Sequence, residues 1–300
     1  MTMTPVKALG AALSATAVVL MSSLPSYAVD VNSTDYIPAP TGATVALSYT
    51  TFTTRSSFKP VGGAEIKDGT KLNSLVETLR FVHYMDVGGF TVAPQVLLPF
   101  GGLFDGKLGG AHLDSAKGMA DPILAAPVWL LNDAEAGRYF AITPYLFVPL
   151  GAYDAGETLN LGENRWKFDM QAGYVHTAGP FTLQLNGDVV WYGANKDAVA
   201  RGSGRLTQDE TYQFQGWLSY APPSDSTLRV ALGYSKLWGG EQKLDGVSNG
   251  SATKADQIRF EVSKFLTPDF QVLGLLQHDL DAKGSFREDL RATIRLLKVL

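Results

Sequence analysis

The side chains in this chain best suited to chemistry are polar and charged residues that recur at every second position. Between 164 and 176 they alternate with apolar residues, as Lys167, Asp169 and Gln171 show, and segment 181–193 repeats the pattern. Successive side chains of a β-strand point to opposite faces, so this spacing gathers the polar groups on one face. Such a face can bind or select a solute through ion pairs and hydrogen bonds.

The same alternation predicts a wet face on further segments. We expect a polar interior, or solute path, lined by Arg80, Gln95, Arg165, Lys167, Asp169, Gln171, Gln184, Asn186, Asp188, Arg259, Glu261, Gln277, Arg291 and Arg295. Two interpretations are open, because interior width depends on strand number. The face forms either a polar constriction that selects solutes or charge-paired filler that stiffens a narrow barrel.

Catalysis is the other chemistry to consider, and its sequence motifs are absent. The chain has no cysteine, which excludes thiol catalysis, disulfides and Cys-ligated metals. It contains neither a Gly-x-Ser-x-Gly elbow nor a His-Glu-x-x-His motif. We therefore expect no catalytic residue, no metal and no cofactor. A surface hydrolase in which His278 faces a loop serine such as Ser285 is kept as an alternative.

Composition and charge exclude other classes. Of the 300 residues, 18% are charged, which is low against the roughly 25% of a soluble protein. The formal net charge is -4 and no basic stripe occurs, so nucleic acid is not an expected partner.

The first residues have the pattern of a secretory signal peptide. Lys7 precedes an uncharged apolar stretch from Ala8 to Met21, and Ser26-Tyr27-Ala28 is a small-x-small cleavage site. The stretch is shorter than the roughly 20 residues of a spanning helix, which argues against an uncleaved anchor. We expect export, with residues 1–28 removed by cleavage near Ala28.

The elements that must position the polar face are long β-strands. Runs of apolar alternation bounded by turn signals predict twelve strands. We place them at 42–53, 73–86, 89–100, 118–131, 139–150, 164–176, 181–193, 210–221, 227–238, 255–265, 270–280 and 287–300. These lengths suit membrane strands, which need about 9–11 residues, better than the strands of a soluble sandwich, which have about 5–6. Aromatic residues such as Trp166, Trp191 and Trp238 lie near strand ends, as in membrane-interface girdles.

The connections between these strands alternate in length. Long ones fall at about 54–72, 101–117, 151–163, 194–209, 239–254 and 281–286. Outer-membrane barrels have short periplasmic turns, long outer loops and an even strand number. Lipid offers no partner for main-chain hydrogen bonds, so the sheet must close. The sequence predicts an all-β fold, a single antiparallel transmembrane β-barrel of about twelve strands over 42–300, after a periplasmic lead-in at 29–41.

The Thr177–Pro180 turn sets the register of the two strands that it joins. It should place Asp169 beside Asp188 on the wet face. Two adjacent carboxylates repel each other, and Lys167 on the same face could bridge them.

Three neighbouring strands each carry a pair of prolines. The up-and-down order places Pro94, Pro127 and Pro144 in one tier across the wall. Proline cannot donate a ladder hydrogen bond and is normally confined to edges, strand ends or bulges. Two interpretations stay open: a kinked wall that opens sideways to release an apolar solute into the bilayer, or bulges without a gating role.

Several segments carry a pattern that is similar to one known family. They are Leu79-Arg-Phe-Val-His-Tyr84 with Gly89-Phe-Thr-Val-Ala-Pro-Gln95, Asn160–Asp169, Trp238-Gly-Gly-Glu241 and Phe286–Lys298. The chain resembles the transporter-like outer-membrane proteins named for the MetA pathway of phenol degradation. The resemblance implies uptake of small hydrophobic or aromatic compounds, whereas the residues by themselves predict only a barrel.

The expected function is a passive channel of the bacterial outer membrane for small hydrophobic or aromatic compounds. No plug domain or nucleotide-binding motif precedes the barrel in the sequence, so no energy source is expected. The expected partners are outer-membrane lipids, small hydrophobic solutes and the barrel-insertion machinery. The alternative is a structural or adhesive barrel without conductance.

Overall fold

The computed structural model describes residues 29–199, 204–249 and 251–300. The predicted signal peptide, residues 1–28, lies outside the described residues. Within the described ranges no helix is long and apolar enough to cross a membrane.

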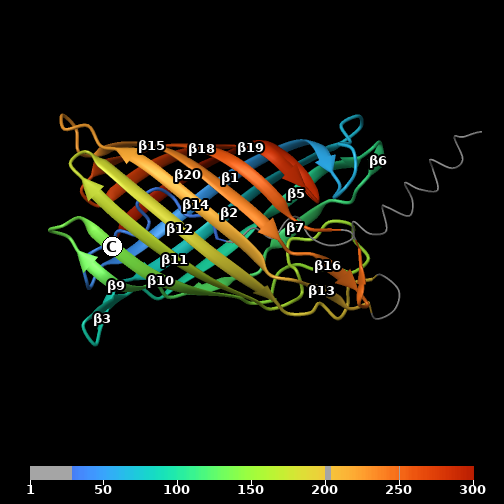
Figure 1. Ribbon diagram of the computed structural model, residues 1–300, viewed down its shortest axis with the longest axis horizontal. Coiled ribbons are helices and arrows are strands. Elements are labelled where there is room, and N and C mark those ends of the chain that lie inside the picture. The colour runs from blue at the N-terminus through green and yellow to red at the C-terminus, as the bar shows by residue number, and fades with distance from the viewer. Residues whose placement is uncertain (1–28, 200–203, 250) are drawn as a thin grey trace, which may run out of the picture.

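The strands form one closed antiparallel barrel of twelve strands, as the sequence predicted (Figure 1). Eleven of the twelve positions are held by β1 (Thr44–Lys59), β2 (Lys71–His83), β5 (Gln95–Leu108), β10 (Arg138–Phe147), β11 (Lys167–Ala178), β12 (Phe181–Tyr192), β14 (Thr211–Tyr220), β15 (Leu228–Gly239), β18 (Lys254–Thr267), β19 (Phe270–Lys283) and β20 (Ser285–Val299). The first and last of these strands, β1 and β20, pair over Val45↔Val299 to Lys59↔Ser285, and this pairing closes the sheet.

The remaining position is an interrupted strand. The run predicted at 118–131 is divided into β7 (Ala116–Met119), β8 (Ile123–Ala125) and β9 (Val128–Asp133). Six shorter strands lie at the two ends of the barrel: β3 (Met85–Val87), β4 (Phe90–Val92), β6 (Ala111–His112), β13 (Leu206–Gln208), β16 (Gln242–Leu244) and β17 (Val247–Ser248). Among them, β13 pairs with β16.

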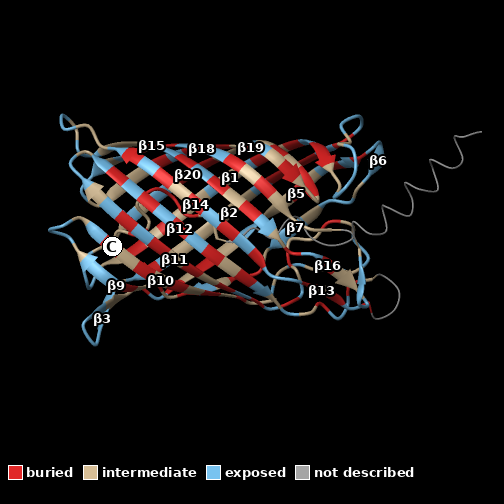
Figure 2. Ribbon diagram, in the orientation of Figure 1, coloured by how far each residue is buried: buried red, intermediate tan, exposed pale blue. Residues whose placement is uncertain are grey.

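Burial alternates along the strands and confirms the predicted faces (Figure 2). In β12, Leu183 and Leu185 are exposed on the outside, whereas Gln184 and Asn186 are buried on the inside. Exposed aromatic residues gather near the strand ends, where Trp191 stacks on Phe168 with 5.7 Å between ring centroids. An apolar outside with a polar inside is the arrangement that a barrel adopts in lipid.

Three predicted details of the connections are wrong. The loop predicted at 101–117 is partly strand, because β5 continues to Leu108. The loop predicted at 281–286 is a tight turn, because β19 continues to Lys283 and β20 begins at Ser285; Gly284 between them has φ +72°, which glycine adopts without strain. At the other end, the hairpin between β11 and β12 turns at 179–180, with Ala178 opposite Phe181.

The tight 179–180 turn shifts the predicted register by two residues. Asp188 lies opposite Gln171, not Asp169, and accepts a 2.8 Å hydrogen bond from Gln171 Nε2. Lys167 forms an ion pair with Glu163.

The N-terminal segment departs most from expectation. Residues 29–41, predicted as a periplasmic lead-in, enter the barrel, where Val31 and Tyr36 are 4% and 3% exposed. We call residues 29–41 the plug. The physical reason is that an irregular segment needs partners for its main-chain groups, and the polar interior supplies them. No periodic pattern in 29–41 signals this position.

Candidate functional site: the plugged lumen

Glutamine side chains on three adjacent strands hold the main chain of the plug. Gln171 Nε2 on β11 donates to the carbonyl oxygen of Val29 at 3.0 Å, and Gln184 Nε2 on β12 donates to that of Asn32 at 3.0 Å. Gln215 Oε1 on β14 accepts from the Val31 amide at 3.1 Å. A primary amide offers both a donor and an acceptor, so this row replaces the strand partner that an irregular segment lacks.

Two buried tryptophans add donors to the same main chain. Trp217 Nε1 donates to the Val31 carbonyl at 3.1 Å, and Trp129 Nε1 donates to the Tyr36 carbonyl at 2.9 Å. Each indole therefore has the hydrogen-bond partner that a buried tryptophan usually requires.

Tyr36 fixes the plug against the wall of β10 and β11. Its hydroxyl donates to Gln171 Oε1 at 2.9 Å and lies 2.9 Å from Thr143 Oγ1. The ring fits because position 173 is glycine: a Cβ on Gly173 would lie 2.3 Å from the ring carbons. A larger residue there is incompatible with this position of the ring.

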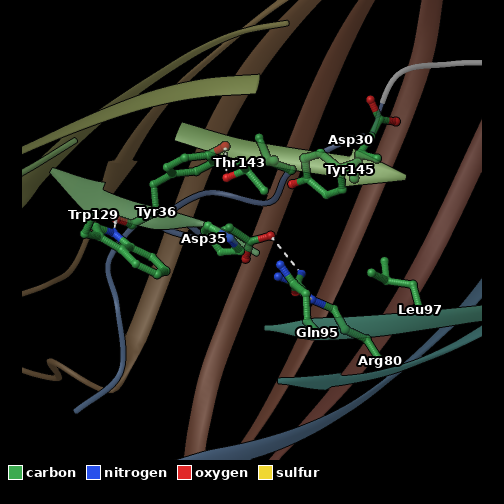
Figure 3. A pocket seen from close by; sticks show the side chains of 12 residues that line it. Asp30, Asp35, Tyr36, Arg80, Gln95, Leu97, Trp129, Thr143 and Tyr145 are labelled. Carbon is green, nitrogen blue, oxygen red and sulfur yellow. Dashed lines mark hydrogen bonds and ion pairs between the residues drawn. The ribbon is translucent and has the colours of Figure 1, made fainter. Parts of the chain in front are cut away.

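Two acids of the plug pair with arginines of the wall. Asp30 lies 2.6 Å from Arg259 and 2.8 Å from Arg291. Asp35 lies 3.0 Å from Arg295 and 3.7 Å from Arg80, the second contact being visible in Figure 3. The plug thus supplies negative charge to a cationic part of the lumen, and charged hydrogen bonds are stronger than neutral ones.

A separate charge cluster lies at the long-loop end of the barrel. Glu163 lies 2.6 Å from Arg165 and pairs with Lys167. Burial would raise the pKa of Glu163, but the positive charges of Lys167 and Arg165 outweigh burial and lower it to about 2. The carboxylate therefore remains ionised and holds the loop against β11.

The plug does not fill the lumen completely. A cavity of about 180 Å³ separates Val29–Asn32 from the wall of β1, β2, β5, β19 and β20. A smaller cavity of about 20 Å³ is also lined by Arg80 and lies beside Tyr36, Trp129 and Tyr145 (Figure 3).

All the residues predicted for the wet face are buried or half-buried, and those that lie on barrel strands point inward. The structure brings most of them to the plug, whereas Arg165 and Lys167 belong to the cluster around Glu163. The prediction missed the plug acids Asp30 and Asp35. It also missed Gln215, although that residue follows the same alternation and could have been found by it.

Pro94, Pro127 and Pro144 lie on neighbouring strands of the wall, and two of them interrupt strands. Pro94 lies between β4 and β5, and Pro127 lies between β8 and β9, whereas Pro144 lies within β10. Main-chain hydrogen bonds cross the tier, from Ala93 to the Pro127 carbonyl at 3.0 Å and from Ala126 to the Pro144 carbonyl at 3.3 Å. Main-chain hydrogen bonding therefore continues across the tier at these two positions.

His278 and Ser285 do not form a hydrogen-bonded pair among the described contacts. The ring Nδ1 of His278 lies 2.7 Å from the main-chain oxygen of Asp289, and Ser285 Oγ is buried without a partner. A nucleophile needs a base within reach, so this geometry gives the hydrolase alternative no support.

These features define an integral β-barrel protein of the outer membrane. The chain belongs to the family described as "Putative MetA-pathway of phenol degradation", whose profile matches residues 55–296. It is similar to the COG4313 outer membrane channel from Pseudomonas putida F1, with 33% identity, a TM-score of 0.83, and coverage of 90% of this chain and 100% of that one.

A more distant similarity shows the fold alone. The translocator domain of the autotransporter NalP from Neisseria meningitidis has 11% identity and a TM-score of 0.52, with 97% of this chain and 96% of that one covered. Comparison with curated protein sequences gives no match.

Proposed function

We propose that the protein is a passive channel for small hydrophobic or aromatic compounds, which pass beside the plug. The observation that carries this proposal is the cavity of about 180 Å³ between the plug and the β1–β2 wall. It leaves a solute-sized space inside a barrel whose relative is a channel. Solute class comes from the family description, which refers to phenol degradation. The proposal includes no catalytic step.

One observation favours the alternative of a barrel without conductance. On β11, β12 and β14 the plug contacts are buried and hydrogen-bonded, so this part of the lumen is filled. A plug that never moves, with no continuous path beside it, would leave a structural barrel.

Planar-bilayer recordings test the two functions. The purified protein should give discrete conductance steps, and added phenol should reduce the current in a saturable way while a sugar of similar size should not. Recordings without steps would support the structural alternative. Equal effects of phenol and sugar on the current would be consistent with a channel and would refute the preference for hydrophobic or aromatic solutes.

A further inference from the structure

The larger cavity has room for a small organic occupant. Its volume is about 180 Å³, and a dry protein cavity of about 150 Å³ is known to hold benzene. The space beside the plug can therefore accommodate one aromatic ring with a small substituent.

The wall presents cationic and neutral polar groups to this cavity. Arg80 and Arg291 line it, together with the hydroxyl of Tyr49, the amide of Gln277 and three threonines. None of the lining residues contributed by the barrel strands is acidic, and the acid at the cavity surface is Asp30 of the plug. An anionic ligand would meet guanidinium groups on the wall side.

Arg80 is the cation with capacity to bind a further carboxylate. Its Nε donates to Gln95 Oε1 at 2.6 Å and its Nη1 donates to the Tyr49 hydroxyl at 3.2 Å, and both acceptors are neutral. Asp35 lies 3.7 Å away, beyond hydrogen-bond distance (Figure 3). A guanidinium can donate five hydrogen bonds, in a geometry that matches a carboxylate.

A second donor beside Arg80 lacks an acceptor. Gln95 Nε2 is buried without a hydrogen-bond partner, and Gln95 lines the smaller cavity that Arg80 also lines. A buried donor without a partner is unfavourable, and such groups are rare in folded proteins. Gln95 does not line the larger cavity, so the donor for an occupant of that cavity is Arg80.

The rest of the lining is apolar. Leu97 and Leu275 contribute from the wall, and Val29 and Val31 contribute from the plug. A flat ring packed between these side chains would be removed from water, which stabilises the bound state. The cavity therefore combines a surface for an aromatic ring with donors for an anion.

We infer that this cavity binds an aromatic carboxylate with a single ring, the carboxylate at Arg80 and the ring against Leu97 and Leu275. The inference rests on the proposed channel function and names the solute class within it. The preferred solutes are organic acid anions, and neutral phenols bind less tightly at this site.

Calorimetric titration of the full-length protein in detergent at neutral pH tests the inference, with sodium benzoate as probe. Benzyl alcohol, which has a similar shape and no charge, should bind at least about tenfold more weakly, because a charged hydrogen bond is lost. Arg80→Gln should abolish the preference for benzoate. Arg80→Lys keeps the positive charge and should retain part of the preference for benzoate. This variant still tests the inference if the glutamine variant does not fold.

Arg229→Gln is the matched control. Arg229 donates to Thr182 and Ser219 near the short-turn end of the barrel and does not line the cavity. This variant should bind benzoate within about twofold of the unaltered protein, since distant sites act independently. Equal affinities for the two probes, or an equal loss in Arg80→Gln and Arg229→Gln, would overturn the inference.

Bilayer recordings on the same preparations separate this inference from the proposed function. If the channel conducts and phenol blocks it while benzoate neither binds nor blocks, the channel stands and the carboxylate site is refuted. If no conductance steps occur, the channel function fails, and the titration still decides whether the cavity binds benzoate.

Discussion

The two halves of the lumen meet the plug in different ways. On β11, β12 and β14, the inward residues Gln171, Gln184 and Gln215 are each 0% exposed and bind the plug main chain. On β1 and β2, the inward residues Tyr49 and Thr78 are half-buried and face the cavity of about 180 Å³. The first half fixes the plug, and the second leaves space for a solute.

The difference follows from side-chain chemistry. Long amides on adjacent strands reach the plug and satisfy its main-chain donors and acceptors, which cannot remain unpaired when buried. The threonines of β1 and β2 are shorter, and Thr51 Oγ1 lies 2.9 Å from Thr293 Oγ1 on the neighbouring strand rather than from a plug atom. A solute path is therefore expected on the β1–β2 side.

The largest effect is expected from a side chain that occupies the space of the Tyr36 ring, where the plug contacts β11. Gly173→Leu would place side-chain atoms where the Tyr36 ring lies, at an overpacking cost of about 1–3 kcal/mol if the ring stayed. We expect the plug to lose its contacts with β11, β12 and β14, the packed half of the lumen. Single-channel conductance, measured in planar bilayers, should then rise several-fold.

Gly187→Ala on the facing strand is the control for that experiment. Gly187 points outward, and the nearest atom to an added Cβ lies 4.0 Å away, so conductance should not change. A folded Gly173→Leu barrel with unchanged conductance would show that the plug does not limit the current.

Neutralising Asp30 should weaken the plug and change ion selectivity. Asp30→Asn removes the counter-charge that lies 2.6 Å from Arg259 and 2.8 Å from Arg291, with an expected cost of about 1–3 kcal/mol. The interior becomes more positive, so the reversal potential in a KCl gradient should shift toward anion selectivity. Asp225→Asn changes a half-buried residue in the turn before β15 and should leave the reversal potential unchanged. The same potential in both variants would contradict a role for Asp30.

Acid should loosen the packed half at its outer end. The pKa of Glu163 is lowered to about 2 from an ordinary value of 4.5, so the folded protein keeps this carboxylate charged where the unfolded chain protonates it. Its stabilisation, on the order of 3 kcal/mol, is complete above pH 4.5 and is lost as the pH falls toward 2.

The measurement is the midpoint of heat-induced mobility change on gels between neutral pH and pH about 2. The unaltered protein should lose stability across the acid range, whereas Glu163→Gln should be less stable at neutral pH and change less on acidification. Glu241→Gln, in an exposed loop, should behave as the unaltered protein. Identical acid profiles for the Glu163 variant and the unaltered protein would contradict this assignment.

The smallest effect is expected at the proline tier. Changing Pro94, Pro127 and Pro144 together to valine should restore ladder donors and straighten the wall. Because main-chain hydrogen bonds already close the tier, we expect unchanged uptake of an apolar solute in cells that express the triple variant. A clear loss of uptake, with unchanged ion conductance, would instead establish a lateral exit through this part of the wall.

Much of the barrel could be predicted from the chain because its physical cause is local. Alternation of apolar and polar residues assigned the two faces of β11 and β12, and the lengths of connections indicated antiparallel hairpins. The register between these strands could not be predicted, because the same residues are compatible with the tight turn at 179–180 and with a longer turn. The shorter turn places Gln171, and not Asp169, directly opposite Asp188.

The candidate site was predictable on the wall and not in the plug. Arg80, Arg259 and Arg291 follow the inward phase of their strands, so their position is fixed by sequence spacing. Their partners Asp30 and Asp35 lie about 45 to 261 residues away along the chain. Such contacts depend on the position that an irregular segment adopts in the folded protein, and no local sequence pattern encodes this position.

The sequence by itself determined that this protein forms a membrane barrel, because the period of two and the strand length act residue by residue. Only the tertiary structure decided that the N-terminal segment enters the lumen, which strands hold it, and where space remains. Those outcomes depend on closing the sheet and then satisfying every buried donor, acceptor and charge within it, and such a requirement is met by the whole interior together.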